Sequence, residues 1–220
     1  FAGISIFSDQ KAVDTLITTR TEPWVVTSHI EAFFHNKPLL YLATFAKNYL
    51  TAFSPDFLFL NGDPNFRHSI GEGFGELPLL FAPFFLLGVI KLFHDRDKKS
   101  SQLMLFWLFL SPIASSLTQG GGNHATRLFV MLPAVVTISA IGFFFFLELF
   151  SKKIITRLGA ALIVLASLIF IFAYWHQYAN HYRYLSFKNW HYGFSQTYTL
   201  LPSVDNAKGD IFINNTYEPS

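Results

Sequence analysis

Long apolar runs are the feature that most constrains what this chain can fold into. Leu128 to Phe150 contains a single charged residue, Glu148, and Leu158 to Trp175 contains none. A helix that is apolar on every face belongs in lipid or inside a large core. With 220 residues, the chain has too little other material to cover several such helices. We therefore predict a mainly α-helical, polytopic membrane protein.

Two shorter apolar segments precede these runs and complete a prediction of four transmembrane helices. The expected spans are approximately residues 77–93, 101–118, 127–150 and 155–175. Pro78 and Pro83 fall in the first turns of the first span, where a missing backbone donor matters least. Three regions follow: an extracytoplasmic segment with amphipathic helices and a Gly-rich loop at 1–76, a transmembrane region at 77–175, and an extracytoplasmic C-terminal region at 176–220.

Basic residues are distributed unequally among the short loops. Seven Lys and Arg residues lie at or between the ends of spans one and two and of spans three and four, whereas only Arg127 lies between spans two and three. The residues of the two basic loops are Lys91, Arg96, Lys98, Lys99, Lys152, Lys153 and Arg157. Cytoplasmic loops are enriched in Lys and Arg. We therefore expect a multi-pass protein of the inner (plasma) membrane, with both chain ends and the turn 118–127 on the outer face.

Composition excludes several functional classes. Charged residues make up 14% of the chain, against about 25% in soluble domains, so the balance is already typical of a membrane protein. The net charge of +2 comes with no basic stripe interleaved with aromatic residues, and we expect no nucleic-acid partner. Because there is no cysteine, disulfides, thiol catalysis and Cys-ligated zinc are excluded.

The N-terminal segment shows weaker patterns. Phe1 to Asp9 alternates like a strand or a loop edge, and the polar stretch that follows predicts one helix or two broken at Pro23. Ile30 to Phe53 has a helical apolar stripe interrupted at Pro38. That stripe is typical of a helix packed on protein, and it also fits a helix lying in the membrane interface.

The C-terminal region is polar and rich in aromatic residues. Tyr192 to Leu201 predicts a helix that ends at Pro202, and Asp210 to Asn214 predicts a strand. A helix followed by a strand is typical of the beginning of a small α/β region.

Two polar stretches attract attention as a candidate site. The Gly-rich loop 61–76 (NGDPNFRHSIGEGFGE) and the turn 118–127 (TQGGGNHATR) emerge on the same side in the predicted topology, and they would bring together Arg67, His68, His124 and Arg127. Arginine recognises phosphate through its bidentate fork, and the glycine amides and a helix N-terminus would add donors. The simpler alternatives are arginines that snorkel to the interface and loop histidines that are merely solvated.

Other polar residues of these stretches are secondary candidates. Asn65 and Asn123 could form hydrogen bonds with a sugar or a phosphate, and Glu72 and Glu76 could orient an acceptor or stabilise the loop. His68, Glu72 and His124 could hold a metal only if the two loops meet, because zinc needs three or four ligands. We assign no metal ligand and no cofactor from the sequence, and a divalent metal remains possible.

Several long strings resemble a known family. They are HNKPL, NYLTAFSPDFLFLNGDPNFRHSIGEGFGELPLL and SPIASSLTQGGGNHATRLFVMLPAVVTISAIG, which together cover roughly residues 34–142. In this order they resemble bacterial integral-membrane glycosyltransferases of the GT-C type, in the branch related to protein O-mannosyltransferases and the lipid A aminoarabinose transferase.

The resemblance implies a polytopic enzyme that transfers a sugar from a polyprenyl-phosphate donor to a protein, lipid or glycan acceptor on the outer face. It also implies a catalytic acidic residue in the first outward loop near the N-terminus. We expect this chain to be a fragment that lacks that region, so no residue is assigned as the general base. The later outward loops would then close over the lipid-phosphate sugar, and replacing Arg127 by Ala should reduce transfer ten-fold or more.

Two other functional classes remain open. A transporter or channel subunit would place ionisable or helix-breaking residues in the middle of the bilayer, where this chain offers Pro112 and Pro133 but no charge. A non-catalytic membrane scaffold would need no cluster of basic residues in adjacent outer loops. Replacing Arg67 and Arg127 by Ala would leave its function unchanged.

Overall fold

The structure is a computed structural model that describes residues 4–26, 29–149 and 153–190 together with Gly193, Gln196 and Thr199. Within these ranges the protein is mainly helical and contains no strand. In the described residues of the segment expected to be extended, 4–9, the only strand-like feature is an isolated antiparallel bridge between Ser5 and Thr118, and Ile6–Ser8 form a 3-10 turn instead of a strand. The strand expected at 210–214, and most of the helix expected at 192–201, lie outside the described residues.

Short helices build the N-terminal part of the chain. They are η1 (Ile6–Ser8), α1 (Gln10–Arg20), α2 (Pro23–Val26), α3 (His29–Phe34), α4 (Lys37–Thr51) and the single π-helical turn η2 (Asp56–Leu60). The predicted interruptions at the two prolines are confirmed, because Pro23 begins α2 and Pro38 stands in the first turn of α4. Proline is tolerated there because the first backbone N–H groups of a helix have no partner within the helix.

The helices that follow the Gly-rich loop include the longest and most apolar ones, joined by short helical turns. They are η3 (Leu79–Phe81), α5 (Ala82–His94), α6 (Lys99–Ser116), η4 (Gly121–Asn123), α7 (Ala125–Leu128), η5 (Phe129–Met131), α8 (Leu132–Glu148), α9 (Lys153–Gln177), η6 (Tyr178–Tyr182) and α10 (Arg183–Ser186). Helix therefore continues well past Trp175, where we expected a polar tail to begin.

Two helical runs are long and apolar enough to cross a membrane. They are Ala125–Glu148, which joins α7, η5 and α8, and Thr156–Ser186, which joins most of α9 to η6 and α10. Leu79–His94 is apolar but shorter. The second long run buries none of its most apolar window against the rest of the protein. These findings support a membrane protein through two candidate spans.

Glycines bring α5 and α8 into backbone contact at the centre of the core. A Cβ on Gly142 would lie 1.8 Å from the carbonyl oxygen of Phe84, and a Cβ on Gly88 would lie 1.9 Å from that of Ile138. Only residues without a side chain permit such an approach, which is how helices pack in membranes. Buried apolar side chains from α5, α6, η5 and α8 surround this contact: Phe85, Leu92, Leu108, Met131, Ala134, Val135 and Ile138.

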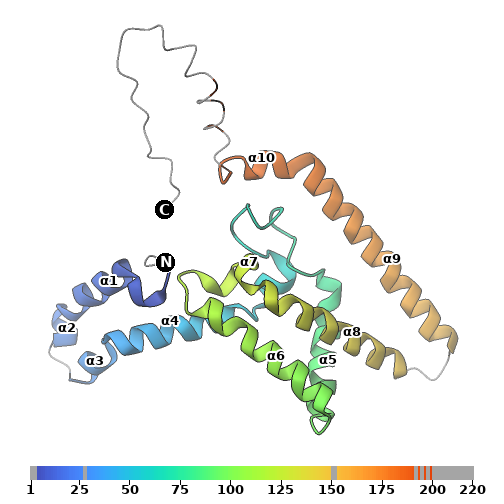
Figure 1. Cartoon of the computed structure of the whole chain (residues 1–220), viewed down its shortest axis with the longest axis horizontal. Helices are drawn as coiled ribbons and strands as arrows, with labels where there is room; N and C mark the ends of the chain where they lie inside the picture. Colours follow the sequence, from blue (N-terminus) through green and yellow to red (C-terminus); the bar gives the residue numbers. More distant parts are fainter. Residues whose placement is uncertain are drawn as a thin grey trace.

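Helix α9 is separated from α8 over most of its length, and the Gly-rich loop 61–76 reaches toward it (Figure 1). The ring of Phe74 contacts Phe170 and Tyr174, with centroids 5.7 and 5.9 Å apart. Gln177 Nε2 donates a hydrogen bond of 3.3 Å to the carbonyl oxygen of Ile70. The loop is therefore attached both to the α5–α8 core and to the C-terminal part of α9.

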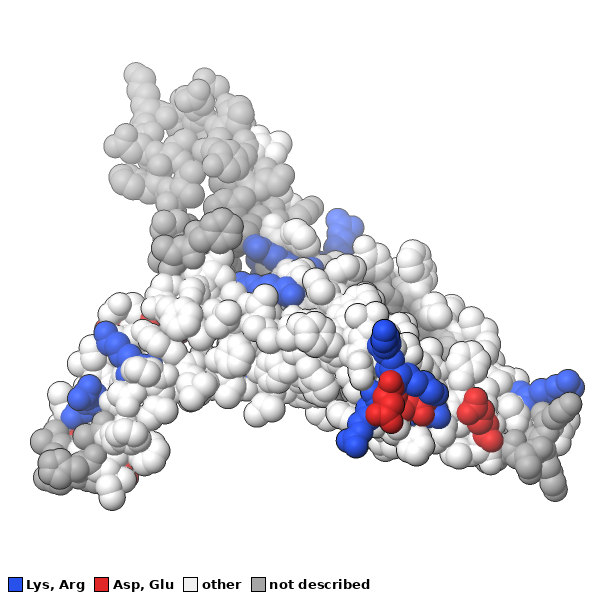
Figure 2. Space-filling model, turned by 60° about the horizontal axis from the view of Figure 1, so that its bottom comes forward, with Lys and Arg blue, Asp and Glu red and all other residues white. Residues whose placement is uncertain are grey.

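Charged side chains on one face of the protein gather near helix ends (Figure 2). The densest group lies at the turn between α5 and α6, where Lys91 and Lys98 pair with Asp95 at 3.2 and 2.9 Å. A broad surface without charge extends over the neighbouring helices. This distribution matches the basic loop that the sequence places between the first two expected spans.

Candidate functional site

The Gly-rich loop 61–76 and the turn 118–127 meet around Asp63. This aspartate is 3% exposed and follows Gly62, whose φ of 70° is readily adopted only by glycine. A Cβ on Gly62 would also lie 2.9 Å from the carbonyl oxygen of Phe74. The close return of the loop on itself, made possible by this glycine, therefore places the Asp63 carboxylate inside the protein.

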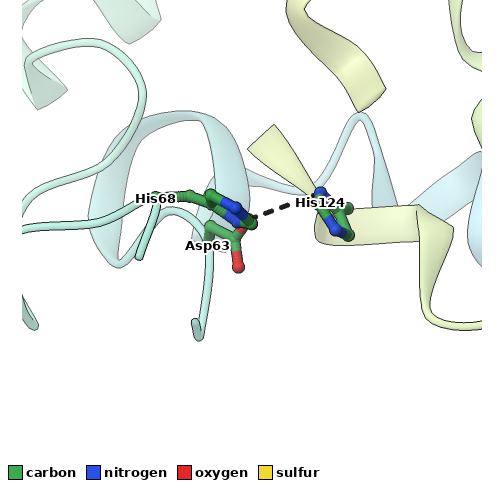
Figure 3. A group of neighbouring side chains, drawn as sticks. All are labelled: Asp63, His68 and His124. Carbon is green, nitrogen blue, oxygen red and sulfur yellow. Dashed lines mark hydrogen bonds and ion pairs between the residues drawn. The ribbon is translucent and has the colours of Figure 1, made fainter. Parts of the chain in front are cut away.

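Three donor groups bind the Asp63 carboxylate, and the side chains of His68 and His124 lie beside it (Figure 3). Its Oδ1 accepts a hydrogen bond of 2.8 Å from the backbone N–H of Asn65. Its Oδ2 accepts from the backbone N–H of Ala125 at 2.8 Å and pairs with His68 Nδ1 at 2.9 Å. His124 Nδ1 lies further away, at 3.8 Å from the same oxygen. One buried carboxylate thus joins two segments that are separated by 62 positions in the chain.

Asp63 also acts as a remote cap for a helix. Ala125 is the first residue of α7, and the run from Ala125 to Glu148 is the first candidate span. The first N–H groups of a helix lack partners within it, and the helix dipole favours a negative charge beside them. His124 provides no side-chain cap, so the Asp63 carboxylate supplies this function from another loop.

His68 and His124 lie next to each other, with ring centroids 4.8 Å apart. Burial lowers the pKa of His124 below its ordinary value of 6.5, and the positive charge of Arg127 lowers it further. Thr126 Oγ1 lies 3.1 Å from His124 Nδ1. His124 is therefore neutral at neutral pH and serves as a hydrogen-bonding group.

A cavity of about 310 Å³ opens beside this cluster. Arg67, His68, Glu76 and Thr126 form its polar lining. The rest of the lining is mainly apolar and comes from η2 and the beginning of the first candidate span: Phe57, Leu58, Ala125, Leu128, Phe129, Met131, Leu132 and Val135. The cavity therefore combines a polar part at the loops with an apolar part that continues along a helix suited to lipid.

Glu76 is the acidic residue in the cavity lining, and its pKa is shifted strongly. Burial, and after it the negative charge of Asp63, raise the pKa of Glu76 to about 7 from its ordinary value of 4.5. A hydrogen bond from the backbone of Asp63 opposes this rise only in part. Glu76 therefore changes its protonation state near neutral pH, and it is able to donate or accept a hydrogen bond toward a bound molecule.

Arg67 connects the cavity with the turn that follows α10. Its Nε donates a hydrogen bond to the carbonyl oxygen of Asn189, and its guanidinium lies 5.8 Å from the centre of the Trp190 ring. Asn189 Nδ2 in turn donates to Asn65 Oδ1 at 3.1 Å. Only the Nε donor of Arg67 is used in this bond, so the guanidinium keeps donors suited to an anion.

The remaining sequence candidates lie around this centre. Arg127 Nη1 donates to Thr118 Oγ1 at 2.8 Å and to the carbonyl oxygen of Gln119 at 3.0 Å, so its side chain is directed into its own turn. Asn123 ends η4 and directly precedes His124. Glu72 is exposed. Among the described residues, the cavity lining contains neither Arg127 nor Glu72.

The structure therefore brings together Arg67, His68 and Glu76 at the cavity, and His68 and His124 at the carboxylate. Sequence reasoning missed Asp63, the residue that joins them. Its signal was present: an acidic residue between Gly62 and Pro64, in the loop that also contains His68. Asp side chains commonly bond the backbone two residues ahead in such turns, as Asp63 does with Asn65.

Asp63, His68 and His124 form a group that could hold a metal ion, with ligand atoms all within 4.8 Å of one another. This set contains Asp63 in place of Glu72, which the sequence had suggested. Three protein ligands are the number found in catalytic zinc sites. However, both oxygens of Asp63 already accept hydrogen bonds, and the described residues contain no buried side-chain polar atom without a partner. The group is therefore satisfied by its own hydrogen bonds.

Comparison with known proteins adds no further assignment: no protein-family model, no curated protein and no solved structure matches this chain.

Proposed function

We propose that this chain is part of a membrane glycosyltransferase that uses a polyprenyl-phosphate-linked sugar as donor. The proposed architecture has four transmembrane helices, in which α5 and α6 span the membrane in addition to the two longer runs. Loops 61–76 and 118–127 would then lie on the outer face, where sugar would pass to a protein, lipid or glycan acceptor. The sequence strings that resemble GT-C glycosyltransferases support this proposal together with the cavity.

The observation that carries the proposal is the two-part lining of the cavity. Arg67 and His68 line its polar part, and Leu128, Leu132 and Val135 line its apolar part at the beginning of a candidate span. A lipid phosphate has the same division, with an anionic head on an apolar chain. The volume of about 310 Å³ lies at the lower end of small-molecule sites, which measure roughly 300–1,000 Å³.

In the proposed reaction, an acceptor hydroxyl oxygen forms a bond to the anomeric carbon of the sugar. The bond between that carbon and the phosphate oxygen breaks, and the lipid phosphate leaves with the electron pair. Negative charge grows on the phosphate, so the fixed positive charge of Arg67 would lower the barrier. The proton of the hydroxyl passes to a catalytic carboxylate, which the resemblance implies for such enzymes.

Glu76 has a supporting role in this scheme. Because its pKa lies at about 7, a large share of molecules carries a protonated Glu76 at neutral pH. A neutral carboxyl group can bond a sugar hydroxyl without repelling the nearby phosphate. A fully ionised carboxylate in the same place would oppose binding of the anion.

Binding of a lipid phosphate is the direct test. The purified protein in lipid nanodiscs would be titrated with polyprenyl phosphate, with the corresponding polyprenol, and with inorganic phosphate. We expect polyprenyl phosphate to bind, and each of the other two to bind at least ten-fold more weakly. Arg67→Ala should weaken binding about ten-fold, since a hydrogen bond to a charged group contributes ~1.5 to 3 kcal/mol.

Arg157→Ala is the matched control, because Arg157 is an exposed arginine near the beginning of α9, far along the chain from both loops. It should bind polyprenyl phosphate like the unmodified protein. Equal affinity for polyprenyl phosphate and polyprenol would contradict the proposal. So would an equal loss of polyprenyl-phosphate binding in Arg67→Ala and Arg157→Ala. Transfer of labelled sugar from a polyprenyl-phosphate donor by the full-length protein would then establish the reaction.

A further inference from the structure

Helix α4 has an apolar face that the described protein does not cover. Leu42 and Leu50 are 61% and 69% exposed, and Ala46 between them is exposed as well. These residues are spaced by four and therefore lie on one side of the helix. Polar residues occupy the opposite side, where Lys37, Thr44, Asn48 and Thr51 recur at helical spacing. The helix is thus amphipathic with its apolar side turned outward.

Asn48 fixes the position of α4 along the axis of α6. Its Nδ2 donates hydrogen bonds to the carbonyl oxygens of Ser116 and Thr118, at 3.1 and 2.9 Å, at the end of α6. Gly122 of the polar turn packs on the same part of α4, because a Cβ there would lie 2.8 Å from the carbonyl oxygen of Asn48. If α6 crosses the membrane, α4 is therefore held at the level where α6 leaves it.

Helix α4 does not run beside α6 for its whole length. Its last turns meet α6, where Tyr49 Oη donates to the carbonyl oxygen of Phe109 at 2.8 Å. Its first turns project away from the helix bundle (Figure 1). If α6 crosses the membrane, this direction carries the first turns of α4 along the membrane surface.

The apolar face is continuous with the side of α6 that would contact lipid. The rings of Phe53 and Phe109 lie 6.0 Å apart, and Phe109 is 41% exposed. Further along α6, Phe106 and Leu110 are 63% and 44% exposed. The adjoining helix α3 extends the exposed apolar surface through Ile30, Phe33 and Phe34.

We propose that α3 and α4 lie in the plane of the membrane surface, with Leu42, Ala46 and Leu50 inserted between lipid acyl chains below the headgroups. The inference rests on the membrane-spanning part of the proposed function and is independent of sugar transfer. Amphipathic helices of this kind bury their apolar face about 5–10 Å into the headgroup and acyl boundary. Through the hydrogen bonds of Asn48, α4 then fixes the depth of the polar turn 118–127 and holds the candidate site at the membrane surface.

Charge has little part in this contact. Residues 4–60 contain four basic side chains, Lys11, Arg20, Lys37 and Lys47, and five acidic ones, Asp9, Asp14, Glu22, Glu31 and Asp56. A segment with this balance has no preference for anionic lipid. Insertion of apolar side chains is therefore the source of the affinity, and neutral phosphatidylcholine should serve as well as a mixture with phosphatidylglycerol.

The protein contains no cysteine, so single cysteines can be introduced and labelled without interference. Leu42→Cys and Leu50→Cys test the apolar face, and Lys47→Cys tests an exposed position toward its polar side. Phe144→Cys, at a 63% exposed position of α8, tests the membrane-spanning part. Each variant would carry an environment-sensitive fluorophore in phosphatidylcholine vesicles that contain lipids spin-labelled near the headgroup or deep in the acyl chain.

We expect the shallow spin label to quench the fluorophore at positions 42 and 50 by roughly twofold or more, and to leave position 47 nearly unchanged. Position 144 lies toward the end of the run Ala125–Glu148 and should be quenched by at least one of the two labels. Quenching at 144 without quenching at 42 and 50 would overturn the inference and leave the spanning helices intact. Energy transfer between labelled copies at 42 would instead assign the face to a second copy. Absence of quenching at 144 would refute the spanning helices themselves.

Discussion

The backbone N–H of Ala125 donates a hydrogen bond of 2.8 Å to Asp63 Oδ2, across 62 positions of the chain. This bond attaches the Gly-rich loop to the first turn of the first candidate span. The same oxygen pairs with His68, which lines the cavity. The position of the cavity lining relative to the membrane-suited helix is therefore set by one buried carboxylate.

Removing this carboxylate should destabilise the protein markedly. Asp63→Ala would leave the N–H groups of Asn65 and Ala125 and the His68 ring without their acceptor. Because hydrogen bonds to charged groups contribute ~1.5 to 3 kcal/mol each and are not additive, we expect a loss of about 3 kcal/mol. Thermal unfolding in detergent would measure it. The exposed Glu72→Ala in the same loop should change stability by less than about 0.5 kcal/mol, and an equal loss in both variants would contradict the account.

Glu76 should make the stability fall as pH rises toward neutrality. Its pKa is raised from 4.5 to about 7 in the folded protein, so between these values the folded state keeps a proton that the unfolded state has released. Stability therefore decreases with pH over this window, and unfolding is opposed most strongly below pH 4.5. Allowing for partial solvent screening, we expect a contribution on the order of 2 kcal/mol.

Glu76→Gln isolates this effect, because glutamine has similar shape and does not titrate. The variant should match the unmodified protein near pH 4.5 and become more stable than it by pH 7.5 in thermal unfolding across this range. Glu72→Gln supplies the control, since Glu72 is exposed in the same loop. Parallel pH profiles for the unmodified protein and Glu76→Gln would show that Glu76 ionises normally.

The glycine contact between α5 and α8 should tolerate no side chain. Gly142→Ala would place a Cβ 1.8 Å from the carbonyl oxygen of Phe84, so the two helices would have to separate. We expect a loss of about 3 kcal/mol or more, seen as reduced folded yield and a lower unfolding temperature. Gly159→Ala in α9 is matched to it, because a Cβ there meets nothing within 4 Å. That change should be neutral or stabilise the helix by up to ~1 kcal/mol.

Hydropathy and proline placement were sufficient to predict much of the fold. The breaks at Pro23 and Pro38 and the two most apolar helices follow from local physics, because a proline lacks an N–H and an uncharged run favours lipid. The extension of helix to Ser186 was not predicted. Polar aromatic residues such as Tyr178 and Tyr182 have no strong local preference against a coil, and here they stack on each other at 5.3 Å along the helix.

The candidate site was predictable only in part. We predicted from the expected topology that the two polar loops converge, and His68 does lie near His124. The hydrogen-bond partners of Arg67 and Arg127 could not be predicted, because a long side chain can reach many acceptors and sequence spacing cannot rank them. Arg127 bonds Thr118 and Gln119 in its own turn, whereas Arg67 reaches Asn189 far along the chain.

The cluster of Asp63, His68 and His124 should not depend on a metal. Because the carboxylate oxygens already accept hydrogen bonds, we expect EDTA to leave the unfolding temperature unchanged and Zn²⁺ to raise it by less than about 1 °C. Differential scanning fluorimetry in detergent would measure both. A Zn²⁺-dependent increase that His124→Ala abolishes and His94→Ala retains would contradict this and establish a metal site.

The membrane topology distinguishes four transmembrane helices from two. With four, the α5–α6 turn lies in the cytoplasm and the Gly-rich loop lies outside, because α5 separates them. With only the two longer runs in the membrane, both segments precede the first span and share one side. Single cysteines can test this difference, because the chain contains no cysteine of its own. Glu72→Cys places a thiol in the Gly-rich loop and Lys98→Cys places one in the α5–α6 turn, both at exposed positions.

An impermeant maleimide applied to intact spheroplasts should label position 72 several-fold more than position 98, and lysis should make the two equal. Arg157→Cys should behave like position 98, whereas labelling of position 98 in intact spheroplasts would reduce the number of spans to two.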